Sequence, residues 1–431
     1  MEDLKKRIHE ISVQAKDASR SLALMTTEKK NICLQGMAKA LQESEEEILE
    51  ANEIDLEKGE AAGLSKPMLD RLKLTTSRIN SMIRGINQVI SLPDPVGVEL
   101  KKTILPNNLK LRKVTSPIGV ISIIYESRPN VTSDAAVLCF KSGNATILRG
   151  GKEAFYSNMA ISKCMIRGAA AVCPEFNPYT IQFIPTVQRE VIPILLSQVG
   201  LVDLCIPRGG ESLIRAVAEC SHIPVIKHYK GVCHIYLHED ADLDMAERIV
   251  INAKTQRPGV CNAVETLLIH EAIALKALLR IGETLIKKGV ILRCDEESYN
   301  LLLKNLPTDL FENHVEHADE SDWDKEYLDL ILSVKLVKTL EEAVSHINHF
   351  GSGHSDCIIT ASTIASSYFQ ESVDSAVVYW NASTRFTDGG EFGMGAEIGI
   401  STDKIGARGP MGLMELTSYK WLVDGEGQIR E

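Results

Sequence analysis

The N-terminal segment, up to about residue 92, shows the apolar spacing of amphipathic helices. Leu4, Ile8 and Ile11 recur at intervals of three or four residues, and the pattern continues through the segment. Residues at this spacing lie on one face of an α-helix, so we expect a group of helices that pack one face inward. A stretch rich in Pro and Gly at 92–97 then ends the helical pattern.

An alternating stretch at 102–114 follows, and its centre favours a turn. Polar and apolar side chains alternate on both sides of Pro106-Asn107-Asn108. Asn and Pro are typical turn residues, so this stretch is predicted to be a β-hairpin. Two interpretations of the hairpin are open: an arm that contacts a second subunit, or an ordinary surface hairpin.

The middle of the chain alternates between short apolar runs and helical segments. In order, we expect strand 120–124, helix 133–142, strand 145–148, helix 153–173, strand 181–184, helix 189–196, strand 202–206 and helix 211–220. A second alternation begins at His234 and runs to about Trp380. This rhythm is typical of βαβ units with a parallel sheet, so two α/β domains are predicted.

Charge and cysteine content exclude several classes of protein. The 431 residues carry a net charge of −11, which argues against a nucleic acid as the main partner. The longest apolar runs are far shorter than the roughly 20 residues of a membrane span. The ten cysteines include no C-x-x-C pair, and no secretory signal is visible. We therefore expect reduced thiols in a cytoplasmic protein that binds neither nucleic acid nor membrane.

Two glycine-rich turns each follow an expected strand and precede an expected helix. Glycines let backbone N–H groups approach an anion at a helix N-terminus, and a neighbouring arginine adds positive charge. A tight βα turn without a ligand is the alternative. Neither a P-loop nor a complete dinucleotide fingerprint is present, and no metal site is predicted. The two turns are Arg149-Gly150-Gly151 and Arg208-Gly209-Gly210.

Cys261 has the surroundings of a reactive thiol. A helix is expected to end near Lys254, Pro258 and Gly259 form a turn, and Cys261 follows, with Arg257 nearby. A loop next to a helix terminus and a cation lowers the pKa of a thiol and makes it a nucleophile. The alternative is a packing role, which we expect for the other nine cysteines.

Three long motifs carry a resemblance to a known family. Residues 116–132 contain Ser-Pro-Ile-Gly-Val and Tyr-Glu-Ser-Arg-Pro-Asn-Val-Thr, residues 141–151 read Lys-Ser-Gly-Asn-Ala-Thr-Ile-Leu-Arg-Gly-Gly, and residues 255–263 read Thr-Gln-Arg-Pro-Gly-Val-Cys-Asn-Ala. With these motifs the chain resembles the gamma-glutamyl phosphate reductase (glutamate-5-semialdehyde dehydrogenase) family, the proline-biosynthesis branch of the aldehyde dehydrogenase superfamily. The likeness extends to residues 408–413, essentially the whole chain.

The resemblance implies an α/β protein with an aldehyde dehydrogenase-like fold: a Rossmann-like cofactor domain, an α/β catalytic domain and a small β oligomerisation arm. The implied cofactor domain is 1–93 with 112–230, the catalytic domain is 231–405, and the arm is 94–111 with 406–431. It also implies a homo-oligomer, either a dimer or a tetramer.

The resemblance further implies NADP(H) as cofactor and assigns residues to it. Arg149 matches a basic residue near the adenosine ribose, where its charge would favour a 2′-phosphate. Gly209 and Gly210 match the turn near the pyrophosphate, and Glu326 aligns with the residue that holds the nicotinamide ribose. The expected cofactor-binding residues are Arg149, Gly150, Gly151, Arg208, Gly209, Gly210 and Glu326.

The implied activity is the reduction of L-glutamyl 5-phosphate by NADPH through a thioacyl intermediate on Cys261. Asn130 and the Cys261 backbone N–H are the expected oxyanion donors. Arg257, Asn381, Arg385 and Thr387 are the expected ligands of the substrate phosphate or α-carboxylate. Channelling from glutamate 5-kinase is one route by which the substrate would arrive.

One departure from the superfamily pattern concerns hydrolysis. Family members that release free acids carry a water-activating Glu, and His228 stands at that position here. An enzyme that exchanges its thioester with phosphate has no use for such a base. A CoA-acylating or hydrolytic aldehyde dehydrogenase and a non-catalytic scaffold are the competing interpretations.

Overall fold

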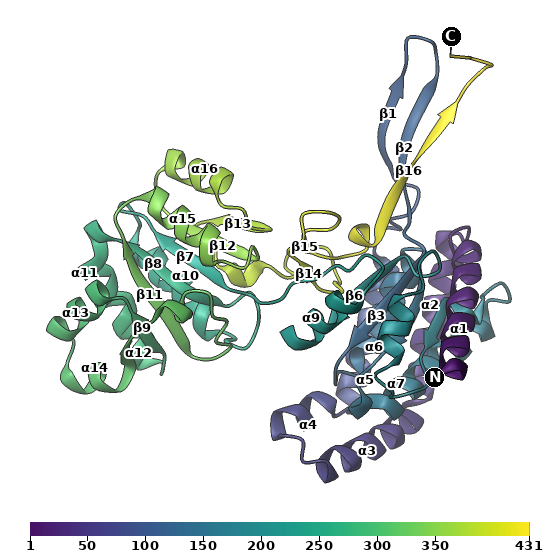
Figure 1. Cartoon of the computed structure of the whole chain (residues 1–431), viewed down its shortest axis with the longest axis horizontal. Helices are drawn as coiled ribbons and strands as arrows, with labels where there is room; N and C mark the ends of the chain where they lie inside the picture. The colour runs from purple at the N-terminus through teal and green to yellow at the C-terminus, as the bar shows by residue number, and fades with distance from the viewer. Residues whose placement is uncertain (431) are drawn as a thin grey trace. The chain divides into compact units, whose positions relative to one another are not determined.

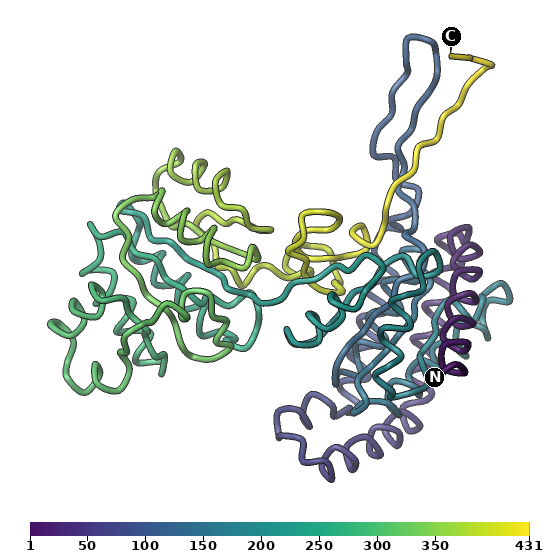
Figure 2. Tube along the Cα trace, in the orientation of Figure 1, coloured from purple at the N-terminus to yellow at the C-terminus, as the bar shows by residue number. Residues whose placement is uncertain are grey.

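The computed structural model describes residues 1–430 and divides into two compact units (Figures 1 and 2). Unit 1 contains Met1–Lys227, Gly393–Gly399 and the chain from Met411 onward. Unit 2 contains His228–Phe392 and Ile400–Pro410. The boundaries differ in detail from those we expected, because Gly393–Gly399 returns to unit 1 and residues 406–410 belong to unit 2.

Helices form the N-terminal part of unit 1, as the apolar spacing predicts. Thr26 and Thr75 each accept a hydrogen bond from the backbone three residues on, which caps the helices that follow them. Buried apolar residues such as Ile8, Leu41 and Ile86 form their inner faces. The helices are α1 (Glu2–Leu22), α2 (Thr27–Glu43), α3 (Glu45–Ala61), α4 (Lys66–Leu72) and α5 (Thr76–Ser91).

A four-stranded parallel sheet in the order β5-β4-β3-β6 forms the centre of unit 1. Its two inner strands, β3 and β4, are buried along their whole length, as expected of a sheet covered on both faces. The strands are β3 (Val120–Tyr125), β4 (Ala145–Arg149), β5 (Ile181–Phe183) and β6 (Leu204–Arg208). The helices between them are α6 (Asn130–Lys141), α7 (Phe155–Val172) and α8 (Val191–Leu196), and α9 (Glu211–Cys220) follows β6.

Unit 2 is built on a seven-stranded sheet in the order β10-β9-β11-β8-β7-β12-β13, parallel throughout. Its strands are β7 (Cys233–Leu237), β8 (Val264–His270), β9 (Ile291–Cys294), β10 (Val315–His317), β11 (Ile331–Val337), β12 (Ser355–Ile359) and β13 (Val377–Trp380). Its helices are α10 (Leu243–Thr255), α11 (Ala274–Ala277), α12 (Glu283–Lys287), α13 (Glu296–Asn305), α14 (Thr308–His314), α15 (Leu340–Phe350) and α16 (Thr363–Ser372). Both predicted α/β alternations are therefore confirmed.

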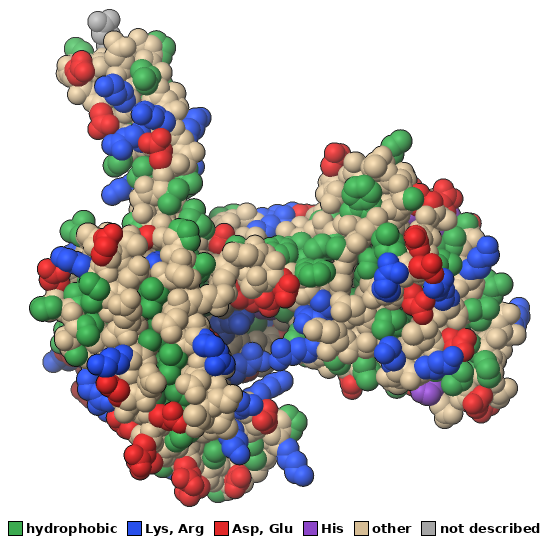
Figure 3. Space-filling model, turned by 180° about the vertical axis from the view of Figure 1, so that it is seen from behind, with side chains coloured by type: hydrophobic (Ala, Val, Ile, Leu, Met, Phe, Trp, Pro, Cys, Tyr) green, Lys and Arg blue, Asp and Glu red, His purple; other side chains and the backbone are tan. Residues whose placement is uncertain are grey.

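The predicted hairpin exists and has a third strand. β1 (Glu99–Ile104) and β2 (Lys110–Pro117) pair around a turn in which Asn108 has a φ of 66°. The C-terminal strand β16 (Thr417–Asp424) pairs with the other edge of β2. We call β1, β2 and β16 the arm. Figure 3 shows apolar and basic side chains on its surface.

A two-stranded ladder, β14 (Ile400–Ser401) with β15 (Gly409–Pro410), completes the described strands. The segment 400–410 that contains it is held on unit 2 by ion pairs from Lys404 and Arg408 to Asp374.

Candidate active site

Cys261 lies at the amino end of the unit 2 sheet, in the loop between α10 and β8. The loop is short because α10 ends at Thr255, and Pro258 cannot continue a helix. Because all seven strands are parallel, the segments that precede β7, β11 and β12 all lie at the amino end of the sheet, which we call the Cys261 edge. These segments supply most of the neighbours of Cys261.

The backbone of Cys261 is in close contact with the segment before β7. A Cβ atom on Gly231 would overlap the carbonyl oxygen of Cys261 and lie 2.5 Å from its Cα, so only glycine fits there. The Sγ of Cys233 donates to the same carbonyl oxygen at 3.2 Å. Cys261 is partly exposed, whereas Cys233 is buried. Burial raises the pKa of the Cys233 thiol well above its usual range. Cys261 itself is held in place through its backbone.

A chain of hydrogen bonds connects Cys233 to other buried side chains of unit 2. His354 Nδ1 lies 3.7 Å from Cys233 Sγ and 2.8 Å from the hydroxyl of Ser355. Ser355 contacts the Thr387 hydroxyl at 2.7 Å, and Tyr379 contacts that hydroxyl at 2.8 Å. Burial, with a smaller effect from His228, lowers the pKa of His354 to about 3, so its ring is neutral at physiological pH.

Arg385 is fixed beside the Cys261 loop. Its Nε donates to Gln256 at 2.8 Å, and its guanidinium contacts the side-chain oxygen of Asn262. Asn262 in turn donates to the carbonyl of Thr387 at 2.9 Å. Burial and the nearby Arg257 lower the pKa of Arg385, so two cationic side chains stand close together next to the thiol. Such a pair attracts an anionic group.

The structure does not bring all four expected substrate ligands to this edge. Asn381 follows β13 at the carboxyl end, where its side chain hydrogen-bonds to the backbone of Thr360 in both directions at 3.0 Å. The length of β12 puts that end on the order of 15 Å from the edge that holds Cys261. With a φ of 57° and these contacts, Asn381 is a turn residue away from Cys261 in this structure. Thr387 is fully buried and supports the hydrogen-bond chain.

Glu326 and Asn130 fall in different units. Glu326 Oε1 accepts the backbone N–H of Gly231 at 2.9 Å, which links it to the residue that packs on Cys261. Asn130 begins α6 in unit 1 and donates to Asp134 Oδ2 at 2.9 Å. Burial raises the pKa of Asp134 to about 6.

The expected cofactor residues lie in unit 1 at the carboxyl ends of β4 and β6, where open α/β sheets bind ligands. Arg149 ends β4, is 7% exposed, and donates to the carbonyls of Gly150 and Val187. Its Nε is buried and has no hydrogen-bond partner. Burial first, and then Arg189, lower the pKa of its guanidinium. A buried donor without a partner and a second arginine nearby fit a nucleotide that carries phosphate.

The second glycine-rich turn, Arg208-Gly209-Gly210, packs closely against Glu126. Gly209 packs so closely on Glu126 that a Cβ would lie 2.7 Å from its carboxyl carbon, and the N–H of Gly210 donates to Glu126 Oε2 at 3.2 Å. Arg208, which ends β6, is partly buried behind Gly399. In this structure a carboxylate therefore accepts the N–H of Gly210, the N-cap of α9, at the place that we expected to receive a pyrophosphate.

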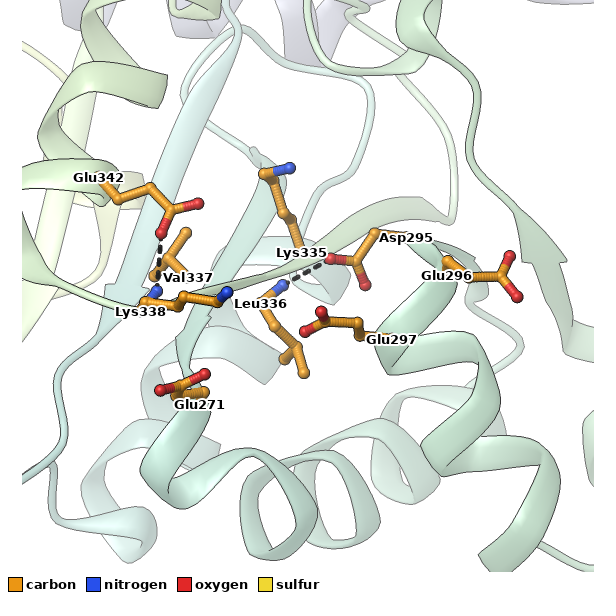
Figure 4. Close-up of a pocket in the computed structure, with 9 residues that line it drawn as sticks. All are labelled: Glu271, Asp295, Glu296, Glu297, Lys335, Leu336, Val337, Lys338 and Glu342. Carbon is orange, nitrogen blue, oxygen red and sulfur yellow. Dashed lines mark hydrogen bonds between the residues drawn. The ribbon is translucent and has the colours of Figure 1, made fainter.

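A separate cavity lies at the carboxyl end of the unit 2 sheet (Figure 4). It is lined by Glu271, Asp295, Glu296, Glu297, Lys335, Leu336, Val337, Lys338 and Glu342. Some of its polar groups form hydrogen bonds within the protein: Asp295 accepts the N–H of Leu336 at 2.9 Å. Among residues 1–430, no group of His, Cys, Asp and Glu side chains is arranged to hold a metal ion. No helix in that range is long and apolar enough to cross a membrane.

Comparisons with known proteins place the chain in a family. The model of the aldehyde dehydrogenase family matches residues 2–291. A gamma-glutamyl phosphate reductase from Sulfurihydrogenibium sp. (strain YO3AOP1) is 50% identical over 429 residues, covering 100% of this chain and 95% of the relative. One from Opitutus terrae is 50% identical over 430 residues, 99% of each chain. The chain belongs to the gamma-glutamyl phosphate reductase family.

The fold is that of the same family. The crystal structure of gamma-glutamyl phosphate reductase from Thermotoga maritima is 43% identical and superposes with a TM-score of 0.94, covering 98% of this chain and 100% of that one. An acetylating aldehyde dehydrogenase from Geobacillus thermoglucosidasius, at 17% identity and a TM-score of 0.67, shares the fold. The aldehyde dehydrogenase-like α/β fold is confirmed, and this member of the gamma-glutamyl phosphate reductase family is an oxidoreductase that uses a nicotinamide cofactor.

Sequence reasoning missed several residues around Cys261. Gly231, Cys233, His354 and Glu265 come from three segments, and only the sheet topology brings them to one end of the sheet. The available signal was weak: Glu265 is a charged residue inside an apolar run.

Proposed function

We propose that this protein reduces L-glutamyl 5-phosphate to L-glutamate 5-semialdehyde with NADPH and releases phosphate, the second step of proline biosynthesis from glutamate. The observation that carries the proposal is the setting of Cys261: a partly exposed thiol whose backbone is fixed by Gly231, next to two arginines. Relatives that are 50% identical over nearly the whole chain bear the name of this activity.

The first step is attack of the Cys261 thiolate on the acyl carbon. A carbon–sulfur bond forms, the carbon–oxygen bond to phosphate breaks, and the product is a thioacyl enzyme. The backbone N–H of Cys261 and, by the resemblance, the side chain of Asn130 stabilise the developing oxyanion. A bound NADPH would supply the hydride, and reduction of the thioester on Cys261 would give a thiohemiacetal. Collapse of that species returns the thiolate and gives the aldehyde.

Arg257 and Arg385 supply the anion-binding part of the site. Arg385 is oriented by Gln256 and Asn262, so its fork is presented without further loss of side-chain freedom. Arg257 is exposed and adds charge beside it. We assign this pair to the phosphate or the α-carboxylate of the substrate.

The water-activating Glu of acid-forming relatives is not present in this chain. His228, which replaces the water-activating Glu of acid-forming relatives, faces the ring of His354 at a centroid distance of 6.1 Å. His354 is neutral and buried. Without that Glu, we expect the intermediate to undergo hydride transfer rather than hydrolysis.

For the cofactor we propose NADP(H), bound by unit 1 at Arg149, Gly150 and Gly151, with Gly209 and Gly210 at the second turn. We further propose that the protein acts in the cytoplasm as a homo-oligomer in which the arm contacts a second copy, and that it receives its substrate from glutamate 5-kinase.

The test is the reverse reaction, NADP+ reduction with L-glutamate 5-semialdehyde in the presence of phosphate. Activity should require phosphate and should fall to the background rate in Cys261→Ser. Cys220→Ser is the matched control, because Cys220 is also partly exposed but lies in α9 of unit 1. Equal rates without phosphate, or with coenzyme A in its place, would contradict the acyl-phosphate substrate. Full activity of Cys261→Ser would contradict the covalent mechanism.

A further inference from the structure

A buried ion pair joins the two ends of the loop that carries Cys261. Lys254, in the last turn of α10, and Glu265, near the start of β8, are both fully buried. Lys254 Nζ lies 2.6 Å from Glu265 Oε2 and also donates to the carbonyl of Val264 at 3.1 Å. The loop of Cys261 is therefore closed at its base by a short, charged contact.

The same carboxylate ties the loop to a second segment. Glu265 Oε1 accepts the N–H of Leu328 at 3.3 Å, and Leu328 has a φ of 55°, a conformation that a leucine adopts only when its surroundings impose it. Two residues earlier, Glu326 accepts the N–H of Gly231, which packs on the backbone of Cys261. The contacts form a closed path from Lys254 through Glu265 and the 326–328 segment to Gly231 and back to Cys261.

Stability alone is a poor explanation for such a pair. Burial raises the pKa of Glu265 to about 7 and lowers the pKa of Lys254, which shows that desolvation opposes both charges. Buried pairs are often replaced by apolar residues without loss of stability, whereas their directional contacts specify one geometry. The pair lies where one geometry matters most, at the base of the nucleophile's loop.

We propose that Lys254 and Glu265 are positioning residues that hold Cys261 in its attack geometry and couple its loop to the 326–328 segment. This inference rests on the proposed function, in which Cys261 is the nucleophile. Neither side chain touches the reacting atoms; both act through the backbone of the loop.

The test compares Lys254→Met with Lys30→Met. Lys30 is an equally buried lysine in unit 1, 2.9 Å from Asp94, and its loss removes a buried ion pair that has no link to the Cys261 loop. Both variants are first shown to be folded by circular dichroism at the assay temperature. We expect kcat to fall about tenfold or more in Lys254→Met with less than about a threefold change in KM, because a small misplacement of the reacting group is costly. The kcat of Lys30→Met should stay within about twofold of the wild type. Equal kcat values in the two variants would overturn the proposal.

A second measurement does not depend on the reaction. The alkylation rate of Cys261 by iodoacetamide, followed by peptide mass spectrometry at pH 7.5, should fall about fivefold or more in Lys254→Met and in Glu265→Gln, while the rate at Cys220 is unchanged. An unchanged Cys261 rate in folded protein would overturn the proposal. If Cys261→Ser kept full activity, the proposed function would fail. The alkylation rate would still test whether Lys254 and Glu265 position the thiol.

The double variant Lys254→Met/Glu265→Leu separates tethering from mere removal of an unpaired charge. It fills the site with apolar side chains, so the melting temperature should recover relative to Lys254→Met. The Cys261 alkylation rate should remain low, because the contact to Leu328 is still missing. Recovery of that rate together with stability would overturn the proposal.

Discussion

At the scale of single residues, the position of Cys261 depends most directly on Gly231. The two backbones touch, and the N–H of Gly231 is held by Glu326. A side chain at position 231 would have to push Cys261 away, because the atoms that it meets belong to the backbone and not to a flexible side chain.

Gly231→Ala should therefore lose activity out of proportion to stability. We expect kcat to fall about 100-fold, because displacement of the nucleophile by about 1 Å disrupts attack, with a cost of about 1–3 kcal/mol in the free energy of unfolding from overpacking. Steady-state kinetics and urea unfolding measure the two effects. Gly282→Ala is the control, since its Cβ would meet only side-chain carbons at 3.5 Å or more. Wild-type kcat in Gly231→Ala would contradict the described contact.

Arg149 carries a second prediction at this scale, on cofactor choice. If its unpartnered Nε and its charge serve the 2′-phosphate, Arg149→Met should raise the KM for NADPH about tenfold or more, the worth of one charged hydrogen bond. The KM for NADH should change less than twofold. Arg167→Met, at an exposed arginine of α7 in the same unit, should alter neither value. A parallel rise in both KM values would assign Arg149 a structural role instead.

At the scale of elements, the sequence predicted the order of helices and strands because burial imposes its period on the residues. The helical spacing of residues 1–92 and the apolar runs of β3 and β7 are local signals, and the structure confirms them. Pairing is not local. β16 joins β2 across about 300 residues of chain, and Lys254 meets Glu265 through a loop whose closure no apolar pattern records.

The position of Asn381 was not predictable for the same reason. Its neighbours in sequence, Arg385 and Thr387, do reach the edge that holds Cys261. The chain between residues 381 and 387 crosses from one end of the sheet to the other, so proximity in sequence did not imply proximity in space. Between β8 and β9 the chain likewise contains a π-helical segment at Leu278–Gly282 that the apolar spacing did not indicate.

The arm provides the prediction at this scale. Tyr419, Trp421 and Val423 alternate along β16 and are each about half exposed, so they form one apolar face of the strand. If that face contacts a second copy, Trp421→Arg/Val423→Arg should lower the molar mass measured by light scattering to that of a smaller species, because burying an unpaired charge is costly. Lys420→Ser, at the exposed residue just before Trp421, should leave the mass unchanged. An unchanged mass in the double variant would show that the arm does not hold the oligomer together.

At the scale of the whole molecule, the charge of −11 says little about the site, because the groups that matter are a few arginines and buried ionisable residues in each unit. The buried groups determine how stability varies with pH. Burial raises the pKa of Glu265, whereas burial lowers the pKa of His346 and His354, so their contributions oppose one another between pH 4.5 and 7.

His346 makes the acid side testable. Burial first, and then the nearby His234, Lys335 and His349, lower its pKa to about 3 from an unfolded value of 6.5. Below pH 6.5 the unfolded chain therefore binds a proton at His346 and the folded chain does not. The free energy of unfolding consequently decreases as pH falls from 6.5 toward 3. At pH 5 the loss from His346 is roughly 2 kcal/mol. His346→Phe, which keeps a ring beside Trp323, should therefore lose less stability than the wild type between pH 7.5 and 5.0. Urea unfolding followed by tryptophan fluorescence measures the difference, since Trp323 and Trp380 lie in unit 2. His354 and Glu265 are present in both proteins, so an identical loss in the two would mean that His346 is protonated as readily in the folded chain as in the unfolded one.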